Sequence, residues 1–473
     1  MLATSNGTGM GHLTRQMAVA LSLGAQVEPV FFSMSRAMPV IGHYGFNGEY
    51  CPSRERGWMP QVRWQDYLRE RVRAFVEETG VKLVVFDGVV PYNGLLRARM
   101  DLPQVQFVWM RRGFWRQGVR TSPLRSTPLF DLVLEPGDLA SAGDHGATAG
   151  LDDAVRLPPI SLTEHVDALS REDAASALGL DPAKPTAVVT LSSGVLNDIA
   201  TPGTAALNAL LEHPDWQVAV TRSALAEGGV PIADHSRCVE LSGVYPLARY
   251  LAAFDAAVSA GGYNSVHELL YARIPTLFVP NRSSGTDDQV ARTRWLAEAG
   301  LAVFADETDF DQVRAQTLRL HDDGLRDDMR AACGKLERPS GSAAAARALI
   351  GLSAAPGAAA ARRNTGRHAE VWAKSAAMSA LGPRGTALAR RALGRSADTG
   401  PARPLRVRVI DELSGTVDPS DNSTTPLTIT ERLDADLLRG DDPVEHVLPG
   451  TSARYHTERL RFARRFYDVV DGA

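Results

Sequence analysis

The chain has 473 residues, of which 44% are hydrophobic and 22% charged, and this composition excludes a mainly disordered or collagen-like protein. The formal net charge of −4 gives no overall basic surface, so we expect no nucleic-acid partner. The three cysteines, Cys51, Cys238 and Cys333, are too few and too far apart for a disulfide framework or a CxxC metal site. We expect a cytoplasmic protein of two or three domains, since the sequence shows neither a signal peptide nor an apolar run of membrane-spanning length.

The first part of the chain alternates expected strands with expected helices. Short apolar runs predict strands at 2–4, 27–32, 83–86, 105–108 and 132–134, and helical periodicity indicates helices at 14–23 and 67–78. Uninterrupted apolar runs are typical of strands that are buried in a parallel sheet. This alternation predicts a doubly wound α/β domain over residues 1–160, with a linker at 157–160.

A second series of the same kind follows the linker. Strands are expected at 186–191, 217–220, 239–241, 256–259, 276–279 and 301–304, and helices at 204–211 and 288–300. We therefore predict a second α/β domain of similar size over residues 161–353.

The composition changes in the tail, residues 354–473. Residues 362–408 carry 11 Lys and Arg side chains against two acidic ones, and an acidic stretch and an expected helix at 451–470 follow. We expect a partly disordered tail with one or two helices. Residues 362–408 are either a disordered basic linker, which we prefer, or a segment that lies on an anionic membrane surface.

The segment after the expected strand 256–259 has the features of an anion-binding turn. Gly261 and Gly262 let a ligand approach the backbone, and a helix that begins at about Asn264 or Ser265 suits a diphosphate. Glu268, one turn further on, can accept hydrogen bonds from both hydroxyls of a ribose. The structural alternative is that Ser265 caps the helix and Glu268 completes a capping box. We favour the ligand interpretation.

This segment resembles the donor-binding signature of GT-B glycosyltransferases. It is similar to that of the lipid-II-forming N-acetylglucosaminyltransferases of peptidoglycan synthesis (the MurG family) and to that of plant secondary-product transferases, and it matches at Gly262, Asn264, Ser265 and Glu268. Ala260 stands where the plant signature has a phosphate-contacting histidine, which makes the bacterial branch the better comparison.

The resemblance implies further donor contacts in the second domain. It assigns the phosphates to the turn of Ser192, Ser193 and Gly194, the uracil to the backbone of Val244, and the sugar hydroxyls to Asp288 and Gln289. Two structural alternatives stay open: an ordinary strand-to-helix turn at 192–194, and a helix cap at Asp287 or Asp288.

The first expected strand leads into a glycine-rich loop that ends at His12. The spacing of Gly7, Gly9 and Gly11 does not fit the dinucleotide-binding pattern GxGxxG. The loop resembles the glycine-rich loop of these transferases, and also that of the UDP-sugar hydrolases of bacterial nonulosonate synthesis. The resemblance implies a phosphate loop at Gly9 and Gly11. His12 is then a candidate base toward an acceptor hydroxyl or a water, with a helix-capping histidine as the alternative.

Two further features lie at carboxyl ends of expected strands. Asp87 follows strand 83–86, where it can contact an acceptor or His12, although a turn-forming aspartate would look the same. Residues 111–116 combine three arginines with aromatic side chains. They suit an anionic acceptor, but we expect a solvated loop.

Taken together, the resemblance implies a GT-B fold, in which two Rossmann-like doubly wound domains face a cleft. The implied reaction moves a sugar from a UDP-sugar, such as UDP-N-acetylglucosamine or UDP-glucose, to a hydroxyl of a lipid-linked or small-molecule acceptor with inversion. It would need no metal and no cofactor besides the UDP-sugar. For a lipid-linked acceptor, peripheral contact with the inner face of an anionic membrane stays open as the alternative to a disordered basic linker. The alternatives are a UDP-sugar hydrolase of the same fold and a non-catalytic nucleotide-sugar-binding subunit.

Overall fold

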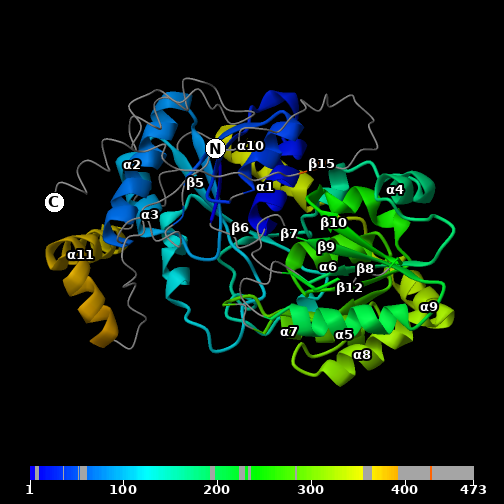
Figure 1. The fold of residues 1–473 in the computed structure, drawn as a ribbon. Coiled ribbons are helices and arrows are strands. Elements are labelled where there is room, and N and C mark those ends of the chain that lie inside the picture. The colour runs from blue at the N-terminus through cyan, green and yellow to red at the C-terminus, as the bar shows by residue number, and fades with distance from the viewer. Residues whose placement is uncertain are drawn as a thin grey trace, which may run out of the picture.

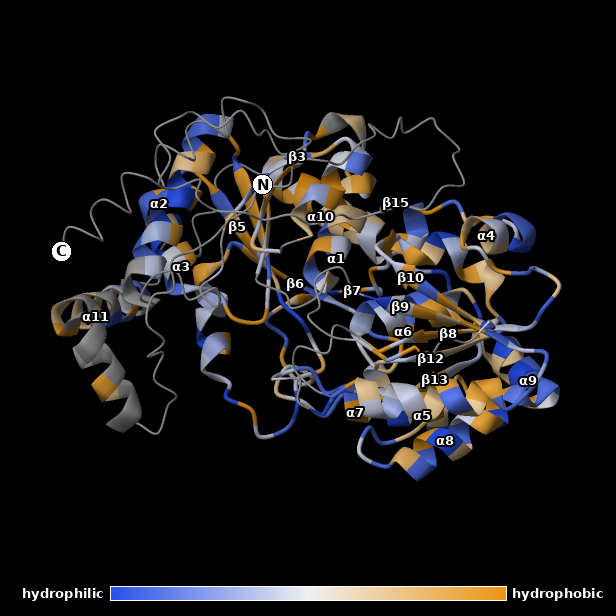
Figure 2. Cartoon of the chain, in the orientation of Figure 1, coloured by the Kyte–Doolittle hydropathy of each residue, from blue (hydrophilic) through white to orange (hydrophobic). Residues whose placement is uncertain are grey.

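Two parallel sheets organise the chain (Figure 1). The computed structural model describes residues 1–5, 10–35, 37–51, 53, 61–191, 198–222, 229–232, 236–282, 285–354, 365–392 and 427–428. The strands are the apolar centre of each domain, and the outer faces of the helices are hydrophilic (Figure 2). Within the described part of the chain, no helix is both long and apolar enough to cross a membrane.

The first sheet has seven parallel strands in the order β3-β2-β1-β4-β5-β6-β7 within the described residues. They are β1 (Leu2–Thr4), β2 (Val30–Ser33), β3 (Asn47–Tyr50), β4 (Leu83–Asp87), β5 (Gln106–Met110), β6 (Leu132–Pro136) and β7 (Val155–Leu157). Helices α1 (Gly11–Ser22), α2 (Gln61–Thr79) and α3 (Asn93–Asp101) connect them. The sequence analysis missed two edge strands: β3, in which Tyr50 is the one apolar residue, and β7, which has only three residues.

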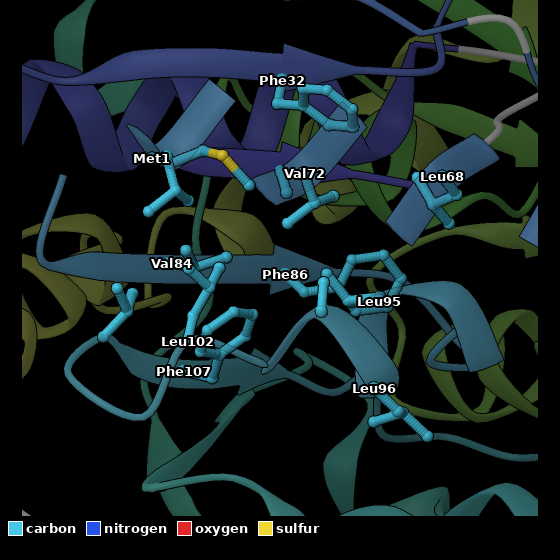
Figure 3. Close-up of a cluster of buried hydrophobic side chains, with 14 of the residues drawn as sticks. Met1, Phe32, Leu68, Val72, Val84, Phe86, Leu95, Leu96, Leu102 and Phe107 are labelled. Atoms are coloured by element: carbon cyan, nitrogen blue, oxygen red, sulfur yellow. The ribbon is translucent and has the colours of Figure 1, made fainter. Parts of the chain in front are cut away.

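The two faces of this sheet pack against different helices. Alternate strand residues point to opposite faces, so Val84 and Phe86 join the cluster under α2 and α3, whereas Val85 joins the cluster under α1. Figure 3 shows Val84 and Phe86 beside Leu68 and Val72 of α2. The first domain is therefore a three-layer α/β/α unit.

The second sheet is a parallel sheet with the order β10-β9-β8-β12-β13-β14. Its strands are β8 (Thr186–Thr190), β9 (Gln217–Arg222), β10 (Cys238–Ser242), β12 (Ala256–Ser259), β13 (Thr276–Phe278) and β14 (Val303–Phe304). The α-helices around it are α4 (Arg171–Ala177), α5 (Ala200–Leu211), α6 (Tyr263–Tyr271), α7 (Gln289–Glu298), α8 (Phe310–Leu318) and α9 (Asp323–Cys333). Short 3₁₀ helices, η1 (Gly24–Gln26), η2 (Met38–Tyr44), η4 (Ser122–Leu129), η5 (Ser141–Gly143), η6 (Leu162–His165), η7 (Leu247–Ala253) and η8 (Arg319–His321), lie between these elements.

Helix α10 (Gly341–Ala354) follows the second domain in sequence but packs on the first (Figure 1). Ala345 and Leu349 are buried in the cluster that contains α1, and the Ser342 and Ser22 hydroxyls are 2.7 Å apart. A Cβ at Gly341 would lie 2.2 Å from the Pro158 carbonyl oxygen, so the chain crosses back at a point where only glycine fits.

Part of the basic segment of the tail forms helix α11 (Thr365–Ala392), in keeping with the expected tail helices; over these residues the disordered linker that we preferred is wrong. It contacts α2, α3 and η4. Val371 is buried against the first domain, and the Trp372 ring lies 5.2 Å from the Arg69 guanidinium and 5.1 Å from that of Arg97. Strand β15 (Leu427–Thr428) pairs with β11 (Val244–Tyr245). The helix predicted at 451–470 lies outside the described residues.

Candidate active site

Each sheet has a switch point, where successive connections leave in opposite directions and ligands of doubly wound folds bind. In the first sheet it lies between β1 and β4, and in the second between β8 and β12. His12 and Asp87 lie at the first switch point, and α6 begins at the second. The two are in contact, because the Asn264 side-chain amide donates to the Gly11 carbonyl at 3.3 Å.

His12 and Asp87 form a hydrogen-bonded pair. His12 is the second residue of α1, which begins after Met10, so its side chain does not cap the helix. Its Nδ1 lies 2.7 Å from Asp87 Oδ1. An ionised aspartate can only accept, so Nδ1 carries the proton and Nε2 is left as the basic nitrogen. Arg15 Nη2 also lies 3.1 Å from Nδ1, but it donates to Asp87 Oδ1 at 2.6 Å. The sequence analysis named both residues without fixing this contact.

Arg15 holds the other side of Asp87. Its Nε donates to Asp87 Oδ2 at 2.8 Å and its Nη2 to Oδ1 at 2.6 Å. Burial would raise the pKa of Asp87, but the Arg15 and His12 side chains outweigh it and lower the pKa to about 2. Burial lowers the pKa of His12 below its ordinary value, and Arg15 adds to this, against the opposing effect of Asp87. At neutral pH the pair is a carboxylate beside a neutral imidazole.

Helix α6 presents uncapped backbone amides. It begins at Tyr263, earlier than predicted, and Gly262 is the N-cap residue without a side-chain cap. The capping-box alternative for Ser265 and Glu268 is therefore wrong. The first-turn amides of a helix have no intrahelical acceptor and carry the positive end of the dipole. This end suits an anion.

Glu268 lies in the second turn of α6. Its side chain is half-buried, and burial raises its pKa to about 7. Among the described residues it has neither a hydrogen bond nor an ion pair from its carboxylate. An unpaired carboxylate beside a helix amino end is free to accept hydrogen bonds from a polar ligand.

Gly261 and Gly262, before α6, and Gly11, at the start of α1, have different structural roles. A Cβ at Gly261 would lie 2.6 Å from Thr293 Cγ2, so Gly261 is needed for packing against α7. Added Cβ atoms at Gly262 and Gly11 would meet nothing within 4 Å. These two positions leave space where the expected ligand would approach.

Asp288 and Gln289 make structural contacts at the start of α7. Asp288 is the N-cap and accepts from the Ala291 amide at 3.0 Å, as the capping alternative required. The Gln289 side-chain oxygen accepts from the Asn281 amide at 3.0 Å. Each side chain keeps a polar atom that these two contacts do not use, so both remain compatible with a sugar ligand. The predicted sugar contacts stay predictions.

The sequence analysis missed a buried ionic cluster at the domain interface. Arg292 donates to Asp138 of the first domain at 2.8 Å and to Asp287 at 2.7 Å. Arg112 lies 3.3 Å from Asp287, and its Nε has no partner among the described residues. Arg111 is fully buried between Glu135 and Asp153. The prediction of a solvated loop at 111–116 is therefore wrong. The sequence signal that could have indicated burial is the position of these arginines directly after a buried strand.

Tyr263 joins the two domains beside this cluster. Its hydroxyl donates to the Gly137 carbonyl at 2.8 Å and accepts from the Ile160 amide at 2.9 Å. A cavity of about 150 Å³ opens next to it, lined by Arg15, Arg112 and Glu135 of the first domain and by Tyr263 and Arg292 of the second. The interface therefore contains a partly open space with several charged side chains in its lining at the carboxyl edge of the first sheet.

Some predicted residues fall elsewhere. Ser192, Ser193, Gly194 and Gly9 lie outside the described residues. The backbone of Val244 is paired with Thr428 of β15. Across the described ranges, His, Cys, Asp and Glu side chains form no group of three that could hold a metal ion.

Comparisons with known proteins agree with this architecture. Residues 239–344 match the glycosyltransferase family 28 C-terminal domain. The chain is 32% identical over 167 residues to the UDP-N-acetylglucosamine--N-acetylmuramyl-(pentapeptide) pyrophosphoryl-undecaprenol N-acetylglucosamine transferase of Paenarthrobacter aurescens (strain TC1), covering 34% of this chain and 40% of that one. It is 30% identical over 105 residues to the protein of the same description from Symbiobacterium thermophilum, covering 22% and 28%. The chain thus spans less than half the length of the curated relatives that it matches.

Solved structures show the fold. The spinosyn forosaminyltransferase SpnP superposes with a TM-score of 0.51 at 16% identity over 75% of this chain and 99% of that one. The spinosyn rhamnosyltransferase SpnG gives 0.50 at 15% identity over 74% and 99%. Residues 239–344 therefore match the glycosyltransferase family 28 C-terminal domain, and the chain has a GT-B fold, as the resemblance to the MurG family predicted.

Proposed function

We propose that this protein is a glycosyltransferase that moves a sugar from a UDP-sugar to an acceptor hydroxyl. The observation that carries the proposal is the His12–Asp87 pair of the first domain, held against the uncapped start of α6 by the Asn264–Gly11 hydrogen bond. A candidate base and a candidate diphosphate site thus meet across the cleft. The family 28 match and the similarity to UDP-N-acetylglucosamine transferases support this reading.

The donor would bind along α6. Its diphosphate would accept hydrogen bonds from the amides at the start of the helix, which the helix dipole favours. The ribose hydroxyls would donate to the carboxylate of Glu268, which is unpaired within the described residues. UDP-N-acetylglucosamine and UDP-glucose are the donors that we propose. With helix amides for the phosphates, the reaction would need neither a metal nor a further cofactor.

The transfer would be a single displacement with inversion. His12 Nε2 takes the proton of the acceptor hydroxyl while the hydroxyl oxygen attacks the anomeric carbon of the donor sugar. The bond between that carbon and the phosphate oxygen breaks, and the electron pair leaves with UDP. Preorganised amides at the start of α6 stabilise the charge that develops on the leaving diphosphate. Asp87 holds the His12 ring in the tautomer that the reaction needs.

The acceptor would be lipid-linked or a small molecule, bound against the first domain. For a lipid-linked acceptor, we propose a cytoplasmic protein in peripheral contact with an anionic inner leaflet. The arginine-rich segment 362–408 would supply the attraction. Helix α11 carries the first part of that segment on the outside of the first domain.

The test is incubation of the full chain with a panel of UDP-sugars, with and without membrane extract from a bacterium. Release of UDP and a glycosylated product only in the presence of an acceptor support the proposal. Hydrolysis at the same rate in both arms would instead indicate a UDP-sugar hydrolase. Binding of UDP without turnover of any donor would indicate a non-catalytic subunit.

A further inference from the structure

Arg15 has no part in the proposed chemistry as described so far, yet it is one of the most buried charges of the site. Only 2% of its side chain is exposed, and it makes two hydrogen bonds to Asp87. Its guanidinium also lies 5.2 Å from the ring of Tyr263, the first residue of α6. It therefore touches both the candidate base pair and the candidate donor helix.

Asp87 alone would have an unwanted effect on His12. A buried carboxylate 2.7 Å from an imidazole favours the imidazolium, because the opposite charges attract in a poorly screened environment. A protonated His12 could not accept a proton from a substrate hydroxyl. The pair needs a second charge to keep the carboxylate as an orienting group without making the histidine cationic.

We infer that Arg15 is a positioning residue that balances the charge of Asp87, so that His12 stays neutral and able to accept a proton. The inference rests on the proposed function only for the role of His12 as base. The charged groups that face His12 from the surrounding elements are Asp87 of β4, Arg15 of α1 and Arg112 after β5, one carboxylate against two guanidinium groups. Arg15 is the one that makes direct hydrogen bonds to the carboxylate.

Arg15 also contacts the second domain. Arg15 is held between Asp87 and the ring of Tyr263, whose hydroxyl is bonded to the first domain at Gly137 and Ile160. Arg15 is therefore enclosed from the second domain as well as from the first.

The test is a titration of His12 by NMR in the full chain, with His12→Gln identifying its signals. Arg15→Met is expected to shift the His12 midpoint upward, and Arg15→Lys, which keeps the charge, to leave it near the wild-type value. In Arg15→Met/Asp87→Asn both charges are gone, and the midpoint is expected to fall again. Arg71→Met removes an equally buried arginine with two hydrogen bonds to Glu49 and is expected to leave the His12 midpoint unchanged.

The outcomes separate this inference from the proposed function. An unchanged midpoint in Arg15→Met overturns the inference. If Arg15→Met does not fold, the His12 midpoint of Asp87→Asn is compared with that of the double variant Arg15→Met/Asp87→Asn. Equal His12 midpoints in these two variants overturn the inference. An upward shift together with an about tenfold loss of transfer at pH 6 that recovers above pH 8 supports both. An upward shift without any effect on transfer supports the inference and overturns His12 as the base.

Discussion

The side-chain amide of Asn264, at the start of α6, donates a hydrogen bond to the backbone carbonyl of Gly11, at the start of α1. These helices belong to different domains, and each begins at the switch point of its own sheet. The bond therefore fixes the distance between the candidate base and the candidate diphosphate site.

Replacing His12 by alanine should leave UDP affinity almost unchanged and lower turnover about 100-fold or more, as loss of a general base does. The base has to be neutral, and the pKa of His12 lies below its ordinary value of 6.5. Wild-type kcat at saturating donor should therefore fall only as the pH drops below 6.5. Calorimetry with UDP and a pH-rate profile provide the measurements, and near-normal turnover in His12→Ala would assign the residue a structural role.

Glu268→Gln should weaken UDP binding by about tenfold to a hundredfold, because a hydrogen bond to a charged group contributes about 1–3 kcal/mol. Its pKa is raised to about 7, and ribose hydroxyls bind the ionised form better. Wild-type affinity should therefore decrease as the pH falls below 7, beyond the change caused by the phosphate itself.

Glu268→Gln provides the control for that last effect, because the variant has no carboxylate to protonate. Its affinity should follow only the titration of the UDP phosphate. Calorimetry at pH 6 and pH 8 distinguishes the two curves. Parallel pH dependence in the variant and the wild type would rule out Glu268 as the ribose acceptor.

The sequence was sufficient for the repeating units and for the turns after strands, but not for contacts between distant segments. Runs such as 83–86 identify buried strands because parallel strands are apolar on both faces. The edge strand β3 carries Asn47, Gly48 and Glu49 and has no such pattern. Helix α10 could not be assigned to the first domain, since its packing on α1 depends on the return of the chain at 158–159.

In the candidate site, too, single residues could be predicted from the sequence, but contacts between distant segments could not. Asp87 could be named because polar residues at carboxyl ends of parallel strands are candidates for function. His12 and Glu268 could be named because they belong to a glycine-rich loop and to a segment that resembles a donor-binding signature. Arg292 could not be named, because a charged residue inside a helix is expected to be solvent-exposed unless its partners are known. Its partners Asp138 and Asp287 come from two domains, and only the folded chain brings them together.

Arg292→Met should therefore destabilise the protein by about 3–5 kcal/mol, since it leaves two buried carboxylates without their shared partner. The matched control is Arg171→Met. Arg171 makes two hydrogen bonds to Asp255 as well, but the pair is partly exposed and its loss should cost about 0–1 kcal/mol. Urea unfolding at pH 7 compares the two variants, and equal losses would contradict the interdomain role of Arg292.

Asp87 should make part of the stability depend on acid pH. Its pKa is about 2 in the folded chain against an ordinary 3.8, so its carboxylate stabilises the fold above pH 4. That contribution, about 2 kcal/mol, should disappear as the pH falls from 4 toward 2. Urea unfolding between pH 5 and pH 2.5 should show the difference between wild type and Asp87→Asn shrinking over this range. A constant difference would mean that Asp87 titrates normally.

A chain that ends at Ser353 should keep transfer to a water-soluble acceptor, yet fail to sediment with anionic vesicles at low salt. The candidate site lies within the two sheets, and α11 has its main contacts with the outer elements α2, α3 and η4. The truncation also removes β15, which frees the Val244 backbone that the resemblance assigns to the uracil. Each Lys or Arg near an anionic surface contributes about 1 kcal/mol, and residues 362–408 carry 11 of them. The full chain with Arg390→Glu and Arg391→Glu keeps the tail but reverses two charges, and it should sediment more weakly than wild type. If the wild-type chain itself does not bind the vesicles, the membrane role is wrong, and α11 serves the first domain through contacts such as those of Val371 and Trp372.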